Sequence, residues 1–298
     1  MTLTSNGTPP PPLEPTMTSD PVGSFKDSWR FAFIHAFCVR FGFFLTAASN
    51  QPFDINELAL AIQSDYSDYL QSLVTQLLQA ASNSRTLTND PDAWQQVLMD
   101  HVYRRTRENP LVWESFNLPL EQGAFALDAH QKVELIWFLC EDLLQNNKEL
   151  HDFISTTIAT KNPKNGPIQI ESFFADSQYK YYYFNDGSPW LYGEMDPLGP
   201  KHQWKALTSS LDEFNKFVET LGLSTQRYQR ILYRLITKDI VPQVERATAK
   251  KRQIERSKLK TAKLHNDAQI LNTRTRQRPT PKYTFDDDFA TEFEDDEY

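Results

Sequence analysis

The sequence predicts a mainly α-helical protein that carries a small β-sheet insert and has disordered ends. Apolar residues recur at helical spacing through most of the chain between residues 25 and 242. One aromatic run, Tyr179–Tyr192, instead reads as two short strands around the turn 185–188, because Asp-Gly between aromatic residues is a strong hairpin signal. A hairpin alone is marginal in water, so we expect the helices on either side to pack around it.

The bulk composition sets the scale of the fold. With 298 residues, 40% of them hydrophobic, the chain can bury one large core or two small ones. No apolar run approaches the roughly 20 residues of a membrane span, and the N-terminus lacks a signal-peptide pattern. Cys38 and Cys140 both lie in apolar helical patterns, which predicts two buried thiols rather than a disulfide or a metal site.

Charge is segregated along the chain, although the formal net charge is only −8. Residues 245–282 hold twelve basic and three acidic residues, and residues 286–298 hold eight acidic residues and no basic one. An acidic body, a basic arm and an acidic tail indicate a nuclear protein that handles DNA or histones. The alternative is a solvated helix followed by a solubilising tail.

The first half of the chain predicts four helices: at about 25–45, from about Phe53, at about 67–81, and from Pro91 to before Pro110. The first is apolar on nearly every face, which is typical of a central helix. Asp54 and Glu57 form a capping-box pattern at the second, and Asp90-Pro91 begins the fourth. His101 on the apolar stripe of the fourth is expected to be a satisfied core histidine. Residues 110–126 are irregular but apolar, so we expect a packed linker.

The second half predicts two helices from Leu127 to about residue 160, a loop at 161–167, the hairpin, and a third strand at 203–207. Ser210 begins a helix that Gly222 is expected to end in a left-handed conformation, and Ser224 caps the next. Pro242 is expected to close or kink that helix. A basic helix follows to about Ala268, and the last thirty residues are expected to be disordered.

The sequence offers no constellation for catalysis. A glycine-rich phosphate loop, a nucleophile elbow and the paired His or Cys spacings of metal sites are all missing. We therefore expect no catalytic, cofactor or metal residues, no cofactor, and a protein that is not an enzyme.

The basic arm supplies the candidate DNA contacts. Spacings of three, four and seven predict that they share one broad helical face, which can neutralise phosphates without reading bases. The candidates are Lys250, Lys251, Arg252, Arg256, Lys258, Lys260 and Lys263. The alternative for this arm is a solvated helix extension.

The hairpin aromatics have two interpretations. In the first, alternate side chains pack on the flanking helices and form a core. In the second, one or two of them remain outside and bind a partner, because exposed Tyr and Trp are preferred interface anchors. Trp190 and Tyr192 are the candidates for such an anchor.

Several segments, taken in order, resemble the DDT and WHIM modules of chromatin-remodelling subunits. Residues 53–62 and 69–78 resemble a DDT domain, residues 109–140 resemble the first WHIM motif, and residues 181–192 and 204–242 resemble the second. The resemblance covers about residues 25–245. Two features depart from the family: the glycine of its Gly-x-Asp signature is missing ahead of Asp176, and no bromodomain or PHD finger is evident.

The resemblance implies a non-catalytic accessory subunit of an ISWI-type nucleosome-remodelling complex, located in the nucleus. Its implied partners are an ISWI-type Snf2-family ATPase, nucleosomal or linker DNA, and histones through the acidic tail, with no membrane. The candidate partner contacts are Asp176, Trp190, Tyr192 and Trp204. A stand-alone, sequence-independent DNA- or histone-binding nuclear protein without an ATPase partner is the alternative.

Composition, charge and this resemblance together divide the chain into six segments. These are a disordered lead-in (1–23), a DDT-like helical domain (24–108), a WHIM-like first motif (109–160), a WHIM-like second motif with the aromatic hairpin (161–244), a basic helix (245–268) and a disordered basic-then-acidic tail (269–298).

Overall fold

The computed structural model places helices and a small sheet where the sequence has helical and strand periods. It describes residues 24–45, 53–82, 91–110, 116, 118–160, 170–196 and 202–275. Within these ranges the chain is mostly helical with one four-stranded antiparallel sheet, which confirms the predicted fold class. The expectations for the lead-in 1–23, Asp90, the loop 161–167 and the tail beyond residue 275 lie outside the described residues.

The elements follow one another as two groups of helices separated by the strands. The first group is η1 (Phe25–Asp27), α1 (Trp29–Leu45), α2 (Ile55–Gln63), α3 (Asp68–Ser82), α4 (Pro91–Glu108), η2 (Leu120–Gln122), η3 (Ala124–Ala126), α5 (Ala129–Asn146) and α6 (Lys148–Thr160). The strands are β1 (Phe174–Ala175), β2 (Tyr179–Tyr182), β3 (Leu191–Met195) and β4 (Gln203–Thr208). The second group is α7 (Leu211–Leu223), α8 (Arg227–Leu235), the π-helical turn η5 (Ile236–Ile240) and α9 (Val241–Thr275). The chain divides into two units, Met1–Val244 and Glu245–Tyr298.

Side-chain caps set several helix starts. Asp128 and Gln131 form a reciprocal capping box at α5, and the Ser210 hydroxyl accepts from the Glu213 N–H at 3.2 Å at α7. At α2 the Asp54 carboxylate accepts from the second helical N–H, that of Asn56, at 3.0 Å, one residue earlier than the predicted partner. Each cap satisfies a backbone donor that the helix itself leaves unpaired.

The helices of the first group enclose one apolar core. Phe31, Ile34 and Cys38 of α1 are buried in it, as the all-round apolar pattern predicts. Cys38 and Cys140 are both buried free thiols, which confirms that prediction, and burial raises the pKa of each. The described part of the linker also packs here, since four of its residues are buried: Phe116, Leu118, Leu120 and Ala124.

The sheet runs in the order β1-β2-β3-β4, with every neighbouring pair antiparallel. The predicted hairpin is confirmed as β2 and β3, in which Tyr182 pairs with Tyr192. The prediction of a tight turn is wrong: the strands end further apart, and Asn185 and Gly187 adopt positive φ within a longer connection. The predicted third strand is β4, and the short β1 was not foreseen, because two residues carry no readable alternation.

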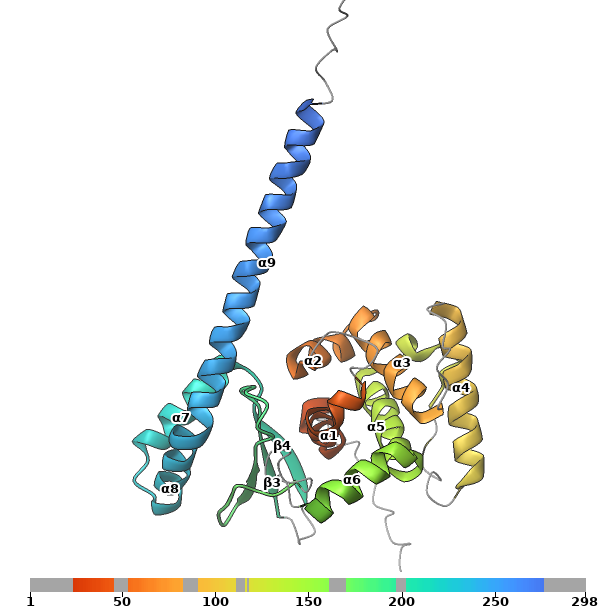
Figure 1. Ribbon diagram of the computed structural model, residues 1–298. Coiled ribbons are helices and arrows are strands. Elements are labelled where there is room, and N and C mark those ends of the chain that lie inside the picture. The colour runs from red at the N-terminus through yellow and green to blue at the C-terminus, as the bar shows by residue number, and fades with distance from the viewer. Residues whose placement is uncertain are drawn as a thin grey trace, which may run out of the picture. The chain divides into compact units, whose positions relative to one another are not determined.

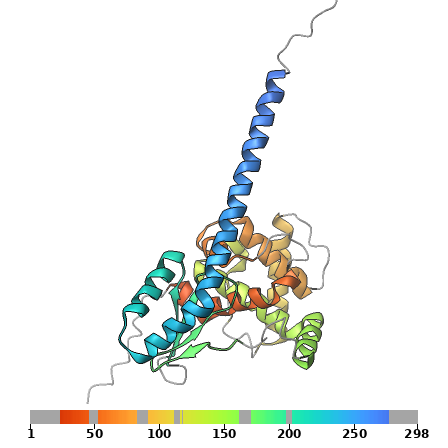
Figure 2. The same ribbon diagram turned by 60° about the vertical axis from the view of Figure 1, so that its left-hand side comes forward.

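The strands alternate between two cores, so the sheet lies between two layers of helices. Tyr182, Trp190 and Tyr192 join the core of the first helix group, whereas Tyr181 and Leu191 join a second core with α7, α8 and η5. This follows from the period of two in a strand, where successive side chains point to opposite faces. Both views show the strands between α1 on one side and the α7–α8 pair on the other (Figure 1 and Figure 2).

Two predicted helix ends in the second group are wrong. Gly222 lies inside α7 with a negative φ, and a Cβ there would be 3.1 Å from the Tyr233 ring, so glycine serves the close approach of α8. Ser224 accepts from the Gln226 N–H but does not cap α8, whose N-cap is Gln226. Gly222 therefore allows α7 and α8 to lie close together, and it does not end a helix.

Pro242 neither closes the helix nor precedes a break. The Val241 N–H bonds to the Ile236 carbonyl, five residues back, and this π-turn lets the helical path continue into α9 despite the missing N–H of proline. α9 then extends to Thr275, seven residues past the expected end at Ala268. No Gly or Pro occurs before Pro279 to stop it.

Two glycines give a matched test of the packing. A Cβ on Gly193 of β3 would lie 2.9 Å from the Tyr179 ring and 3.1 Å from a Leu207 methyl, whereas a Cβ on Gly42 of α1 would meet nothing within 4 Å. We expect Gly193→Ala to lower the free energy of unfolding by about 1 to 3 kcal/mol through overpacking. Gly42→Ala should instead raise it by up to about 1 kcal/mol through helix propensity. Urea unfolding of both variants measures the difference, and equal effects would contradict this packing of β3.

Candidate functional site

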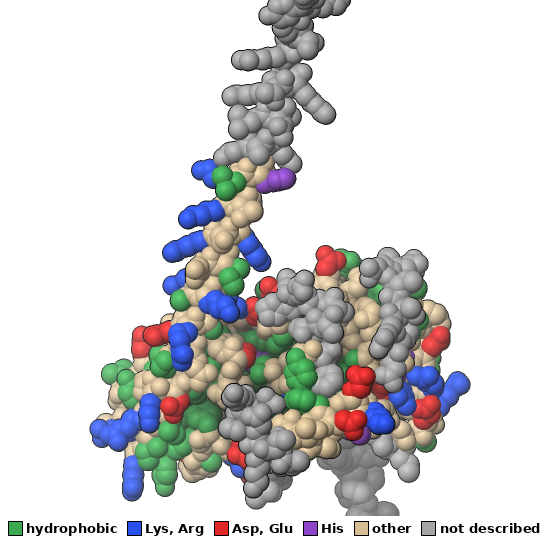
Figure 3. All heavy atoms as spheres, viewed as in Figure 1, with side chains coloured by type: hydrophobic (Ala, Val, Ile, Leu, Met, Phe, Trp, Pro, Cys, Tyr) green, Lys and Arg blue, Asp and Glu red, His purple; other side chains and the backbone are tan. Residues whose placement is uncertain are grey.

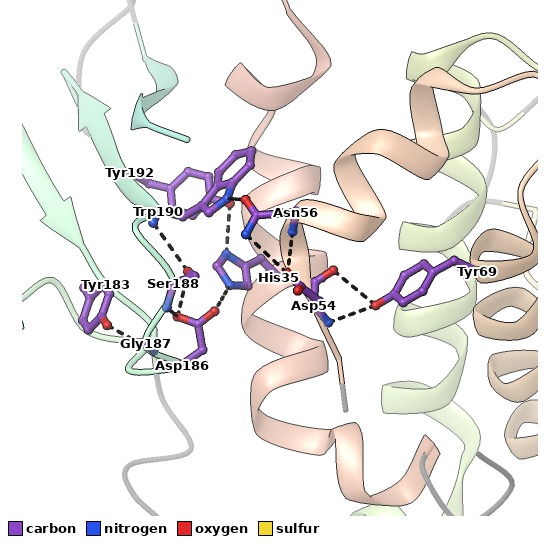
Figure 4. Close-up of polar contacts among 10 residues, drawn as sticks. All are labelled: His35, Asp54, Asn56, Tyr69, Tyr183, Asp186, Gly187, Ser188, Trp190 and Tyr192. Atoms are coloured by element: carbon purple, nitrogen blue, oxygen red, sulfur yellow. Dashed lines mark hydrogen bonds and ion pairs between the residues drawn. The ribbon is translucent and has the colours of Figure 1, made fainter. Parts of the chain in front are cut away.

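A buried polar network joins the hairpin connection to α1. His35 is fully buried, and its Nε2 lies 2.9 Å from a carboxylate oxygen of Asp186 while its Nδ1 lies 3.0 Å from the Tyr192 hydroxyl (Figure 4). Because a carboxylate only accepts, Nε2–H donates to Asp186, and in the neutral imidazole Nδ1 accepts from Tyr192. The second oxygen of Asp186 accepts from the Ser188 N–H and hydroxyl at 3.0 and 2.8 Å.

The environment of Asp186 favours its charged form. Burial by itself would raise the pKa of this carboxyl, but hydrogen bonding to His35, favourable electrostatics with that ring and the two bonds from Ser188 together lower the pKa below its ordinary value. Burial, reinforced by the charge of Asp186, raises the pKa of Tyr192. Asp186 therefore acts as an anionic acceptor that fixes the hairpin connection on α1.

The same network continues into α2. The Trp190 indole N–H donates to the Asn56 side-chain oxygen at 2.9 Å, and the Asn56 N–H donates to Asp54 at 3.0 Å (Figure 4). The Asp54 N–H in turn donates to the Tyr69 hydroxyl of α3. Trp190 and Tyr192 are each only 1% exposed, so the prediction that they are surface anchors for a partner is not supported. Their rings complete the core, and their polar atoms are already bonded.

The other two partner candidates lie nearer the surface. Asp176 is half-buried, and its carboxylate accepts from the Gln178 and Tyr179 N–H groups and from the Tyr181 hydroxyl at 2.7 to 2.9 Å. It thus holds the turn between β1 and β2. Trp204 is half-buried on β4, with its ring centroid 4.9 Å from that of Tyr182. These two residues remain the candidates for a partner contact.

The basic candidates all lie on α9 and are all exposed. Helix geometry divides them, so the expectation of one broad face is wrong. Arg252, Arg256, Lys260 and Lys263, separated by four, four and three residues, share one face, and Lys251 and Lys258 lie on another. Figure 3 shows Lys and Arg side chains on more than one side of this helix. Arg252, Arg256, Lys260 and Lys263 are called the α9 basic face below.

The cations of the α9 basic face are not neutralised by acidic side chains among the described residues. None of its four cations forms an ion pair with a residue that the structure describes. The rise of about 1.5 Å per residue spreads them over roughly 16 Å. That arrangement is suited to several successive phosphates of a nucleic-acid backbone.

A second basic stripe was missed by the sequence reasoning. Arg227, Arg230 and Arg234 of α8 and Lys238 of η5 are all exposed, opposite the buried Leu232 and Ile236. None of the four forms an ion pair within the described part of the chain. Their separations of three, four and four residues are visible in the sequence. The same helix also carries an apolar stripe, and that stripe alone was used to predict its role, as a core helix.

α5 is the helix through which much of the first group is joined. The Lys132 ammonium donates to the Ser64 carbonyl at 2.7 Å, just after the last turn of α2. The buried Asp142 lies 2.9 Å from Nε2 of His101 and 3.0 Å from Nε of Arg105, both on α4. His101 is therefore a satisfied core histidine, as predicted.

Two kinds of site find no support among the described residues. No group of three or more His, Cys, Asp or Glu residues there is placed to hold a metal ion. Likewise, none of the helices in those ranges has the length and apolar character needed to cross a membrane.

Comparison with known protein families identifies one motif in this chain. Residues 110–155 match the WHIM1 family, described as motif 1 of a set of proteins that includes WSTF, Itc1p and MBD9. The match spans the packed linker, all of α5 and part of α6. The curated proteins and the solved structures give no match. The chain therefore contains a WHIM1 motif, and this motif supports a WHIM-containing, chromatin-associated protein.

Proposed function

We propose that this chain is a non-catalytic accessory subunit of an ISWI-type nucleosome-remodelling complex in the nucleus. In this role it docks a Snf2-family ATPase and contacts linker or nucleosomal DNA. The observation that carries the proposal is the WHIM1 match at residues 110–155, whose helix α5 is bonded to α2 and α4 in the middle of the first helix group. The same proposal includes the assignment of residues 24–108 as a DDT-like domain and of residues 161–244 as a second WHIM-like motif.

The charge distribution supports the DNA contact. The α9 basic face and the α8 stripe present eight exposed cations that the described residues leave unpaired. Contacts to phosphate give affinity without sequence information. We therefore expect binding to duplex DNA that is independent of sequence and steeply dependent on salt.

Co-purification tests the ATPase contact. The full-length tagged chain is expected to recover a Snf2-type ATPase from nuclear extract after nuclease treatment, which removes bridging by DNA. Loss of the ATPase, with duplex binding retained, would overturn the subunit proposal in favour of a stand-alone DNA- or histone-binding protein.

Asp176 offers a point substitution for the same experiment. Asp176→Asn keeps a side-chain oxygen for the Gln178 and Tyr179 N–H groups but removes the charge, so the turn should persist. If this carboxylate meets the ATPase, D176N lowers the recovery several-fold, as for one partner of a desolvated charge pair. Glu171→Gln, which neutralises an exposed acid five residues away, is the matched control and should leave the recovery unchanged.

A further inference from the structure

The α9 basic face carries apolar side chains as well as cations. Leu259 and Leu264 are 71% and 70% exposed, and their positions on the helix border the stripe formed by Arg252, Arg256, Lys260 and Lys263. Exposing such large aliphatic side chains to water is unfavourable, and contact with another apolar group would bury them. Backbone phosphates would pair with the cations but would leave both leucines in water.

The same chain contains a segment with the complementary composition. Between Asp286 and Glu297 lie eight acidic residues, with Phe289 and Phe293 among them and Phe285 just before. The carboxylates match the cations of α9, and the aromatic rings match its exposed leucines. A purely solubilising tail would need the charges but not the phenylalanines.

The length of the chain permits the two segments to meet. Lys263 lies twelve residues before Thr275, which is about 18 Å along the helix. Asp286 lies eleven residues after Thr275, and an extended chain of that length reaches up to about 36 Å. The acidic residues can therefore return to the α9 basic face, with the rest of the tail long enough to continue toward Arg252.

We propose that the tail, Asp286–Glu297, docks on the α9 basic face of its own chain and competes there with nucleic-acid phosphates. This proposal rests on the DNA contact stated above for its regulatory consequence, but the docking itself needs no DNA. Within one chain the effective concentration of a tethered segment reaches the millimolar range, so even weak docking is populated. DNA binds to the fraction of chains whose face is free, and the tail thereby lowers the apparent affinity.

Substitution of the full-length chain tests the competition. Converting all eight tail acids to Asn or Gln is expected to raise the affinity for a random-sequence 30-bp duplex roughly tenfold at low salt. Phe289→Ala with Phe293→Ala keeps the charge, so it isolates the apolar part and is expected to raise the affinity by a smaller factor. A tail that acts only by long-range repulsion of DNA would show no effect of the phenylalanines.

A direct readout of the docking uses no DNA. Cys38 and Cys140 are buried, so a nitroxide reacts selectively with Ser257→Cys on the exposed surface of α9. It is expected to broaden the amide resonances of Phe289 and Phe293 at low salt, and the broadening should fade near 1 M salt, where screening is strong. The same label at Ser155→Cys on α6 is the control and should leave these resonances sharp.

The outcomes separate this proposal from the proposed function. Sharp tail resonances with the label at position 257 would overturn the docking, and an unchanged DNA affinity after neutralisation of the tail would overturn the competition with DNA. If the chain with the neutral tail binds no DNA at all, the proposed DNA contact fails, and the label alone decides the docking.

Discussion

Asp186→Ala is expected to lower the free energy of unfolding by about 3 kcal/mol, because it leaves a fully buried histidine without its anionic acceptor. The substitution removes the 2.9 Å contact to His35 and both bonds from Ser188, which together fix the hairpin connection on α1. Urea unfolding followed by tryptophan fluorescence measures the change, since Trp190 lies in the same network. Glu219→Ala on the exposed side of α7 is the control, with an expected change within about 0.5 kcal/mol.

The pH dependence of stability gives a second readout for Asp186. Its pKa is lower in the folded chain, so its contribution is present above the unfolded pKa and is lost as the pH falls through the folded pKa. Asp186→Asn should therefore flatten the loss of stability in acid, while retaining an oxygen that accepts from Ser188. A variant D186A that unfolds at the same urea concentration as the parent would show that the network does not hold the sheet to the helices.

Replacing Lys250, Lys251, Arg252 and Arg256 with alanine is expected to weaken duplex binding by about a hundredfold near 0.1 M salt. Each phosphate that loses its cation reduces the slope of log affinity against log salt by about 0.9, and Arg252 and Arg256 are the two of these residues on the α9 basic face, so the slope should fall by roughly 2. Fluorescence anisotropy with a labelled duplex at several salt concentrations measures both quantities. All four side chains are exposed on α9, so the fold should be retained.

A matched variant separates a local contact from a change in net charge. Arg107, Lys148, Lys205 and Lys216 are exposed cations of the first unit, and converting them to alanine removes the same charge. We expect this variant to keep most of the salt slope. If both variants reduce the salt slope by the same amount, then the residues at 250–256 act only through the total charge of the protein. That outcome would favour the alternative, in which this arm is a solvated helix extension.

The helices and the hairpin were predictable because their signals are local. Asp128 with Gln131 and Ser210 with Glu213 lie three residues apart, and a cap needs only that spacing. The alternation of Tyr181 and Tyr182 likewise follows from the strand itself, although the sequence does not say what lies on each face. The basic and acidic segments at the C-terminal end were visible from the charges alone.

The failed predictions concern residues whose role depends on a neighbour that the local sequence pattern does not reveal. Gly222 resembles a helix end, but Tyr233 of α8 determines its use. Pro242 resembles a stop, but the π-turn 236–240 absorbs its missing donor. Trp190 and Tyr192 resemble interface anchors, but Asn56 and His35 bury and bond them.

By itself the sequence determined a mainly helical chain, its aromatic hairpin and the separation of its charges, because periodicity, capping and composition act over a few residues. Only the tertiary structure decided that His35 bonds to Asp186, 151 residues further along, and that the sheet divides its side chains between two cores. The physical reason is that a buried polar atom must find its partner in space, and the sequence does not record which distant residue the fold brings within about 3 Å.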